Sequence, residues 1–170
     1  FDNLKSKKLK FIEKINGMWS FIYADLNDNE IILSRDRYGK KPLYYYEDEK
    51  IFISSSDTRS IFNYLNLTSR AVDIKSLLNM YAVKLNAYSG ESTFYRDIKQ
   101  VKPGHSMIIN IKNFQKKIIQ NKNFENFSKK TIFIDPVKSF RKEFDNALNL
   151  RLVSDRKIGF LISGGMDSST

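Results

Sequence analysis

The chain has 170 residues, of which 41% are hydrophobic and 14% aromatic, enough to form the core of an ordinary domain. It contains no cysteine and one histidine, which excludes disulfides, thiolate metal sites and a cysteine nucleophile among these residues and disfavours a His-rich metal cluster. No apolar run is long enough to span a bilayer, and the opening residues FDNLKSKKLK lack a signal-peptide pattern, so we expect a soluble, cytoplasmic protein.

The formal net charge is +10, and a basic surface of this kind can attract nucleic-acid phosphates. The lysines, however, occur as scattered pairs in different contexts, without a stripe of interleaved aromatic residues. These pairs are Lys7-Lys8, Lys40-Lys41, Lys116-Lys117 and Lys129-Lys130. We therefore expect a solvated, lysine-rich surface, with no nucleic-acid partner and no membrane partner.

Residues 17–111 contain short apolar runs rich in β-branched and aromatic side chains, separated by polar turns. Such runs are typical of strands. Leu77, Leu78 and Tyr81 instead have helical spacing, which predicts a short helix over Asp73–Val83 with Asp73 as its cap. A second helix is expected before Gly17. The predicted strands resemble an antiparallel meander over Met18–Ala24, Glu30–Ser34, Pro42–Tyr46, Lys50–Ser54 and Ser106–Ile111.

The pattern changes after residue 112. Residues 113–130 are dominated by Asn, Lys and Gln, as in a linker or a long edge hairpin. Asp135 followed by Pro136 then predicts the start of a helix that ends near Leu152. Its apolar face is formed by Val137, Phe140, Phe144, Ala147 and Leu148. The next apolar run, Ile158–Ile162, predicts a buried parallel strand of an α/β sheet, and one helix with one strand makes an incomplete domain.

The segment SGGMDSST, Ser163 to Thr170, directly follows this predicted strand. Adjacent glycines let successive backbone N–H groups turn toward one anion, and the serine hydroxyls and the start of a helix add further donors. The segment lacks the lysine of a Walker A loop. Because Asp167 is acidic, a polyphosphate bound here requires a cation, and we expect Asp167 to ligate Mg²⁺ directly or through water.

SGGMDSS resembles the SGGxDSS signature of PP-loop ATP pyrophosphatases, which cleave ATP between the α and β phosphates. The resemblance implies that Ser163, Gly164, Gly165, Asp167 and Ser168 bind ATP and pyrophosphate with Mg²⁺. It also places Leu161 near the adenosine.

The upstream segments INGMWSFIYAD and LSRDRYGKKPLYYY resemble class II glutamine amidotransferase domains of the asparagine synthetase family. Further resemblances follow in the same order: Ser55–Asp57, where the family usually has SE, then Thr93-Phe94 and Pro103–His105, and finally Val153–Asp155, which precedes the predicted strand as the family's SDVPVG segment does. The implied fold is α+β, with Ntn-hydrolase-like antiparallel sheets and helices, followed by the beginning of an α/β parallel-sheet PP-loop domain. We expect residues 1–112 to form the C-terminal portion of the amidotransferase domain, 113–134 a linker or edge hairpin, and 135–170 a truncated ATP-binding domain.

The resemblance implies a ligase that uses glutamine as amide donor, adenylates aspartate or another carboxylate with ATP, and amidates it. Its glutaminase nucleophile, a cysteine, would lie before Phe1. Alternatives are an enzyme acting on a sugar carboxylate in polysaccharide biosynthesis, a β-lactam synthetase and a catalytically silent homologue. A homodimer is left open. These residues alone are expected to be inactive and poorly stable.

The residues around the RDRYGKKP segment are expected to serve structure more than catalysis. Asp36 or Arg37 is predicted to make a charge-assisted hydrogen bond in a turn, Gly39 to relieve backbone strain and Pro42 to open a strand. A lone histidine without a partner is a weak candidate for a general base, so His105 is expected to make a turn or interdomain contact.

Overall fold

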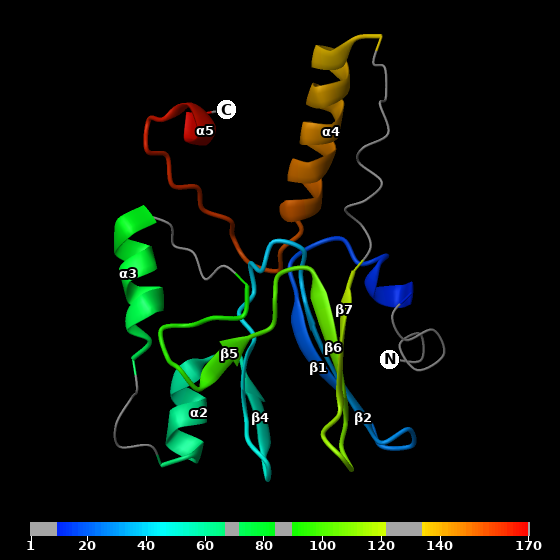
Figure 1. Ribbon diagram of the computed structural model, residues 1–170. Coiled ribbons are helices and arrows are strands. Elements are labelled where there is room, and N and C mark those ends of the chain that lie inside the picture. The colour runs from blue at the N-terminus through cyan, green and yellow to red at the C-terminus, as the bar shows by residue number, and fades with distance from the viewer. Residues whose placement is uncertain (1–9, 67–71, 84–89, 122–133, 170) are drawn as a thin grey trace. The chain divides into compact units, whose positions relative to one another are not determined.

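The computed structural model describes residues 10–66, 72–83, 90–121 and 134–169 (Figure 1). The chain divides into two compact units, Phe1–Asn126 and Phe127–Thr170. Each unit is described below by itself.

The first unit contains two antiparallel sheets. A four-stranded sheet has the order β1 (Ser20–Asp25), β2 (Glu30–Arg35), β6 (His105–Asn110), β7 (Lys116–Gln120), and a three-stranded sheet has the order β4 (Phe52–Ser55), β3 (Tyr44–Glu47), β5 (Ile98–Gln100). The predicted single meander is therefore wrong. β1–β2 and β3–β4 are hairpins as expected. β6, however, pairs with β2, although the three strands of the second sheet and two helices, α2 (Thr58–Tyr64) and α3 (Ile74–Val83), lie between them in the sequence.

The predicted strands and the predicted α3 lie within about two residues of the observed ones. Asp73 precedes α3 as predicted, and its carboxylate accepts hydrogen bonds from the Lys75 backbone N–H at 3.1 Å and the Ser76 hydroxyl at 2.8 Å. Residues 10–12 are helical, in agreement with the helix expected before Gly17, and residues 1–9 lie outside the described residues. α2, β5 and β7 were not predicted individually, although β7 pairs with β6 as an edge hairpin would.

Three apolar clusters show how the layers pack. On one face of the four-stranded sheet, Leu33, Met107 and Ile109 pack with Leu43, Tyr45 and Val101 from the side of the three-stranded sheet. On its other face, Ile32 and Ile108 pack with residues of the 10–12 helical turn, and Ile61 and Phe62 of α2 cover the far side of the three-stranded sheet. The order of layers is helix, sheet, sheet, helix, which confirms the predicted α+β fold with antiparallel sheets and helices.

Arg35, at the end of β2, joins the two sheets through hydrogen bonds. Its side chain is buried, with 6% of its surface exposed. Nε donates to the Lys41 carbonyl at 2.8 Å, one terminal nitrogen to Gln100 Oε1 at 2.7 Å and to the Val101 carbonyl at 2.8 Å, and the other to the Gly39 carbonyl at 2.9 Å. Burial lowers the pKa of Arg35, against the opposing effects of Tyr44 and Asp36, yet an arginine remains charged at physiological pH.

Asp36 fixes the turn that follows Arg35. Its carboxylate accepts hydrogen bonds from the backbone N–H groups of Tyr38, Lys40 and Lys41 at 2.9–3.1 Å. Its carbonyl accepts from the N–H groups of Gly39 and Gly104. Asp36 therefore makes the predicted charge-assisted hydrogen bonds and ties the turn to the loop before β6.

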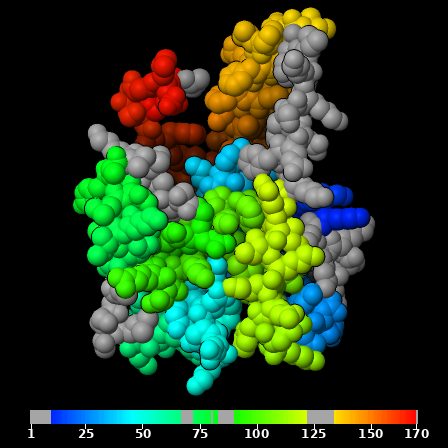
Figure 2. Space-filling view, viewed as in Figure 1, coloured from blue at the N-terminus to red at the C-terminus, as the bar shows by residue number. Residues whose placement is uncertain are grey.

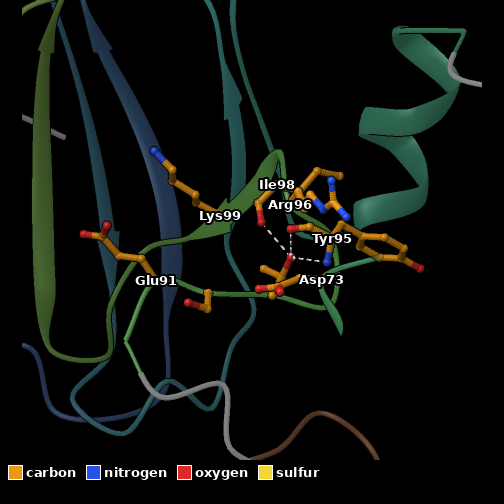
Figure 3. Close-up of a pocket in the computed structure, with 8 residues that line it drawn as sticks. Asp73, Glu91, Tyr95, Arg96, Ile98 and Lys99 are labelled. Atoms are coloured by element: carbon orange, nitrogen blue, oxygen red, sulfur yellow. Dashed lines mark hydrogen bonds between the residues drawn. The ribbon is translucent and has the colours of Figure 1, made fainter. Parts of the chain in front are cut away.

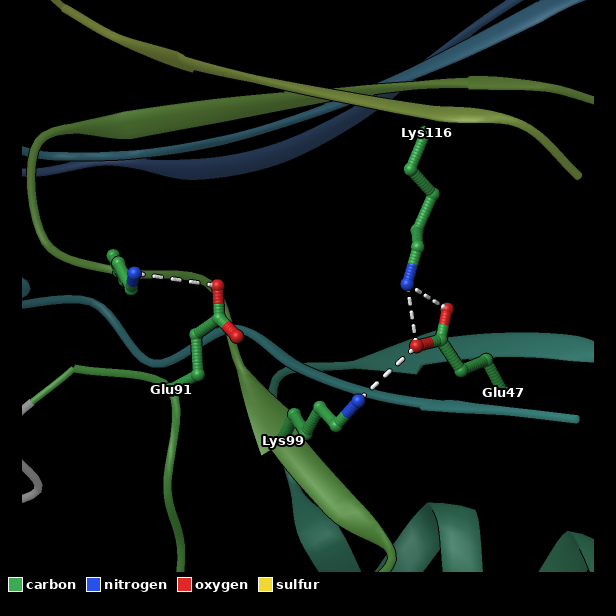
Figure 4. Close-up of polar contacts among 5 residues, drawn as sticks. Glu47, Glu91, Lys99 and Lys116 are labelled. Carbon is green, nitrogen blue, oxygen red and sulfur yellow. Dashed lines mark hydrogen bonds and ion pairs between the residues drawn. The ribbon is translucent and has the colours of Figure 1, made fainter.

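A cluster of ion pairs also connects the sheets (Figure 4). Lys116 of β7 donates to the Glu47 carboxylate of β3, at 2.6 Å to Oε2, and Lys99 of β5 donates to Oε1 at 3.2 Å. Lys102 and Glu91 form a separate pair at 3.6 Å. Burial acts to raise the pKa of Glu47, but the hydrogen bonds from Lys116 and Lys99 together outweigh it, so the pKa is lowered.

The second unit contains the predicted long helix, α4 (Pro136–Arg151). Asp135 caps it, since its carboxylate accepts from the Lys138 N–H at 3.0 Å. No residue of α4 is buried, and on its predicted apolar face 78% of Val137 and 70% of Phe140 are exposed; the helix is drawn in orange in Figure 2. The rings of Phe140 and Phe144 stack at 5.8 Å.

The predicted buried strand over Ile158–Ile162 is not observed. These residues have no strand assignment, and 72% of Phe160 and 99% of Leu161 are exposed. A strand needs a hydrogen-bonded neighbour, and the described part of this unit contains no other extended segment that pairs with it.

Among the helices of the described ranges, none combines the length and hydropathy that a membrane-spanning segment requires.

The packing around Gly39 yields a first prediction. Gly39 has φ +61°, and an added Cβ would lie 2.9 Å from Pro103 Cγ and 3.1 Å from Arg35 Cζ. Gly90 has φ +82°, but the nearest atom to its added Cβ, Lys102 Cε, is 4.0 Å away. In the full-length protein, Gly39→Ala should cost about 1–3 kcal/mol more than Gly90→Ala, because only Gly39 adds overpacking to the strain of the left-handed backbone. Thermal denaturation of both variants measures the difference, and equal losses would contradict the packing described here.

The ion pairs of Glu47 yield a second prediction. A carboxylate whose pKa is lowered by folding adds stability above its unfolded pKa, and this stability disappears as the pH falls through the folded pKa. Replacing Glu47 by Gln should therefore lower thermal stability above pH 4.5, the ordinary pKa of Glu, and the difference should shrink below pH 4.5 and vanish once the pH is below the lowered pKa of the folded state. The effect should not exceed about 1 kcal/mol, because the lysines are partly exposed. Glu49→Gln, at an exposed position after β3, is the control, and a loss independent of pH would argue against the ion pairs.

Candidate functional site

The glycine-serine loop predicted to bind phosphate spans Ser163 to Ser169. Gly164 has φ +78°, a left-handed conformation that favours glycine. The short helix α5 (Met166–Ser169) begins two residues later, and the Ser169 N–H donates to the Gly165 carbonyl. The loop therefore makes the sharp turn into a helix that the sequence predicted.

Hydrogen bonds bring three of the predicted site residues together. The Ser163 N–H donates to Ser168 Oγ at 3.2 Å, and the two serine Oγ atoms are 2.9 Å apart. The Gly165 N–H lies 3.4 Å from Ser163 Oγ, to which it donates, and Ser168 Oγ donates to the Gly165 carbonyl at 3.2 Å. Hydroxyl oxygens thus accept from two backbone N–H groups that the predicted phosphate site would use.

Asp167 lies in the first turn of α5 and is exposed. Across the residues that the structure describes, no group of three or more His, Cys, Asp or Glu side chains could hold a metal ion by itself. Mg²⁺ is commonly bound by one or two carboxylates together with substrate phosphates. A single exposed carboxylate within the loop predicted to bind phosphate is compatible with that mode. Leu161 is 99% exposed, and the described residues do not bring it against the loop.

A polar hollow of about 180 Å³ lies in the first unit (Figure 3). Among its lining residues, Thr93 Oγ1 donates to the Ile98 carbonyl at 2.6 Å and accepts from the Tyr95 N–H at 3.0 Å. Three of the charged lining groups bind other parts of the protein: Asp73 accepts from Lys75 and Ser76, Glu91 pairs with Lys102, and Lys99 pairs with Glu47. The lining is formed by Asp73, Glu91, Ser92, Thr93, Tyr95, Arg96, Ile98 and Lys99.

His105 makes the turn contact that the sequence predicted. Its Nδ1 lies 2.8 Å from the Pro103 carbonyl, and because a carbonyl only accepts, Nδ1 carries the proton.

The importance of Arg35 was missed, since the sequence pointed to Asp36 or Arg37. The alternation of side chains along β2 could have indicated it, because Arg35 lies on the same face of the strand as Ile31 and Leu33, which pack between the two sheets.

Comparisons with known proteins identify two family matches. Residues 4–121 match the family of glutamine amidotransferase domains, and residues 139–170 match the asparagine synthase family. The second match contains α4 from Ser139 onward and the glycine-serine loop.

The chain is also similar to complete relatives. It is 28% identical to the glutamine-hydrolysing asparagine synthetase 3 of Bacillus subtilis, covering 93% of this chain and 25% of the relative. It is 26% identical to the glutamine-hydrolysing asparagine synthetase 2 of the same organism, covering 97% of this chain and 23% of the relative. It is 27% identical to the glutamine-hydrolysing asparagine synthetase of Mus musculus, covering 94% of this chain and 27% of the relative. The chain thus spans about a quarter of the length of these relatives. It belongs to the glutamine amidotransferase domain family and is homologous to the glutamine-hydrolysing asparagine synthetases.

Proposed function

We propose that the protein containing this chain is an ATP-dependent carbon–nitrogen ligase that forms asparagine, or another amide, from a carboxylate and glutamine-derived ammonia. The observation that carries the proposal is the order of its parts: an amidotransferase match over residues 4–121 is followed by an asparagine synthase match that contains SGGMDSS. The names of the relatives support glutamine as the amide donor. Aspartate as the acceptor is part of the proposal.

The chemistry explains why such an enzyme needs a phosphate loop. A carboxylate is a poor electrophile at neutral pH, and transfer of AMP to it supplies a leaving group that ammonia can displace. We assign pyrophosphate binding to Ser163, Gly164, Gly165 and Ser168. On binding, the hydroxyl oxygens that now accept from the N–H groups of Ser163 and Gly165 would give way to phosphate oxygens.

Asp167 is assigned to magnesium, directly or through a water molecule. Mg²⁺, when bound, offsets the negative charge that develops on pyrophosphate. Asp167 directly precedes Ser168 in the same short helix, which supports a role for its carboxylate near the proposed phosphate donors. Leu161, two residues before Ser163, is proposed to contact the adenosine.

Several further assignments stay proposals. The division into residues 1–112, 113–134 and 135–170 is one of them, with β7 lying in the middle segment. A cytoplasmic location, a cysteine nucleophile before Phe1 and the inactivity of these residues alone are others. No observation on the described residues favours a sugar carboxylate acceptor, a β-lactam synthetase or a silent homologue.

Asp167→Asn in the full-length protein tests the assignment. The variant should lose ATP–pyrophosphate exchange by about 100-fold or more, because the amide carries no charge with which to hold the cation. Its circular dichroism spectrum should match the wild type, since Asp167 is exposed. Exchange would be measured over a range of Mg²⁺ concentrations, and a partial rescue at high Mg²⁺ would support a metal-binding role.

Asp155→Asn is the matched control. Asp155 is also exposed and lies in the turn between α4 and the loop, outside the proposed site. Its variant should exchange at the wild-type rate. Undiminished exchange in Asp167→Asn would remove Asp167 from the proposed mechanism.

A further inference from the structure

A row of polar side chains crosses one end of the four-stranded sheet. Trp19 precedes β1, Ser34 lies in β2, Ser106 lies in β6 and Asn121 follows β7. Trp19 Nε1 donates to Ser34 Oγ at 3.3 Å, the Oγ atoms of Ser34 and Ser106 are 3.0 Å apart, and Ser106 Oγ donates to Asn121 Oδ1 at 2.9 Å. Ser34 and Ser106 are directly opposed in the strand register and have no exposed surface.

The available protons give this row one direction. Each serine has a single hydroxyl proton, and an amide oxygen can only accept. Ser106 therefore uses its proton on Asn121, Ser34 uses its proton on Ser106, and the indole N–H of Trp19 donates to Ser34. The donated protons of Trp19, Ser34 and Ser106 then each have an acceptor and every bond points toward Asn121, an arrangement in which neighbouring hydrogen bonds strengthen one another.

The row ends at a donor group without a partner. Asn121 is 6% exposed, and its Nδ2 is the one buried side-chain nitrogen or oxygen without a hydrogen-bond partner in the described part of the chain. A buried amide nitrogen left unpaired loses its hydration without compensation, so native structures nearly always pair it.

Rotating the amide by 180° does not remove this problem. Nδ2 would then donate to Ser106, and Ser106 to Ser34, which already accepts from Trp19. The hydroxyl proton of Ser34 would be left without an acceptor, and Asn121 Oδ1 without a donor. The orientation described here leaves fewer groups unpaired, so the network itself assigns the amide orientation.

We propose that Asn121 Nδ2 is a built donor site for a neutral oxygen acceptor, supplied either by an ordered water or by a backbone carbonyl. A neutral acceptor fits because the groups of the row are themselves uncharged, and a buried carboxylate would require a nearby cation. The acceptor would fix the point at which the chain leaves β7, because the Asn121 backbone N–H already donates to the Gly104 carbonyl at 2.8 Å.

A high-resolution crystal structure of the full-length protein tests the site. The expected result is an oxygen within about 2.7–3.2 Å of Asn121 Nδ2. An isolated density peak identifies a water, a chain carbonyl identifies the second source, and both support the proposal. A buried Nδ2 with no acceptor, or an amide rotated so that Nδ2 faces Ser106, would overturn it.

Two variants supply an independent measurement. Ser106→Ala removes the bond to Oδ1 and keeps the Nδ2 site, whereas Asn121→Leu removes both. If an acceptor is bound, Asn121→Leu should lower the thermal midpoint of the full-length protein by several degrees more than Ser106→Ala does. Gln120→Leu, at the exposed preceding position, is the control for a changed side chain at the end of β7. An Asn121→Leu midpoint equal to or above that of Ser106→Ala would mean that Nδ2 has no partner.

Discussion

The two sheets of the first unit depend on a buried charge, the guanidinium of Arg35. Apolar contacts between the sheets are non-directional and would tolerate several relative positions. The hydrogen bonds of Arg35 are directional, and they end on Gln100 and Val101 at β5 and on the turn before β3. Loss of the side chain would leave buried carbonyl groups unpaired as well as removing a cation. Asp36, the next residue, supports these bonds. Its carboxylate holds the turn whose Gly39 and Lys41 carbonyls accept hydrogen bonds from Arg35.

The features predicted correctly from the sequence are those decided by near neighbours along the chain. Asp135 and Asp73 act on N–H groups two or three residues away, so the helix starts could be located without knowledge of the fold. The turn at Asp36–Gly39 is local in the same way. Strands β1 to β4 and β6 were found because their apolar runs are bounded by turn residues. The entry of the glycine-serine loop into α5 was also predicted locally, from its adjacent glycines, whereas its binding of an anion stays a prediction.

The features that were missed depend on residues far apart in the sequence. The pairing of β2 with β6 joins Ser34 to Ser106, and nothing in either strand alone selects that partner over a meander. β5 has only three residues and follows a segment without a regular period, so its place beside β3 is decided by pairing and by the Gln100–Arg35 bond. Over Ile158–Ile162, by contrast, a strand was predicted that the structure does not contain. The composition of these residues is that of a buried strand, but composition cannot supply the hydrogen-bonded neighbour that makes a strand.

The absence of this strand bears directly on the proposed phosphate loop. The loop residues can converge on an anion only if the segment before them is held in place, and Phe160 and Leu161 are exposed in the second unit as described. The same unit exposes Val137 and Phe140 on α4. Two exposed apolar surfaces that precede one loop in the chain are typical of elements that pack against a sheet, as in an α/β domain. Covering them would bury apolar area and fix the loop in one step, so the stability of the second unit and the competence of the proposed phosphate loop should be acquired together.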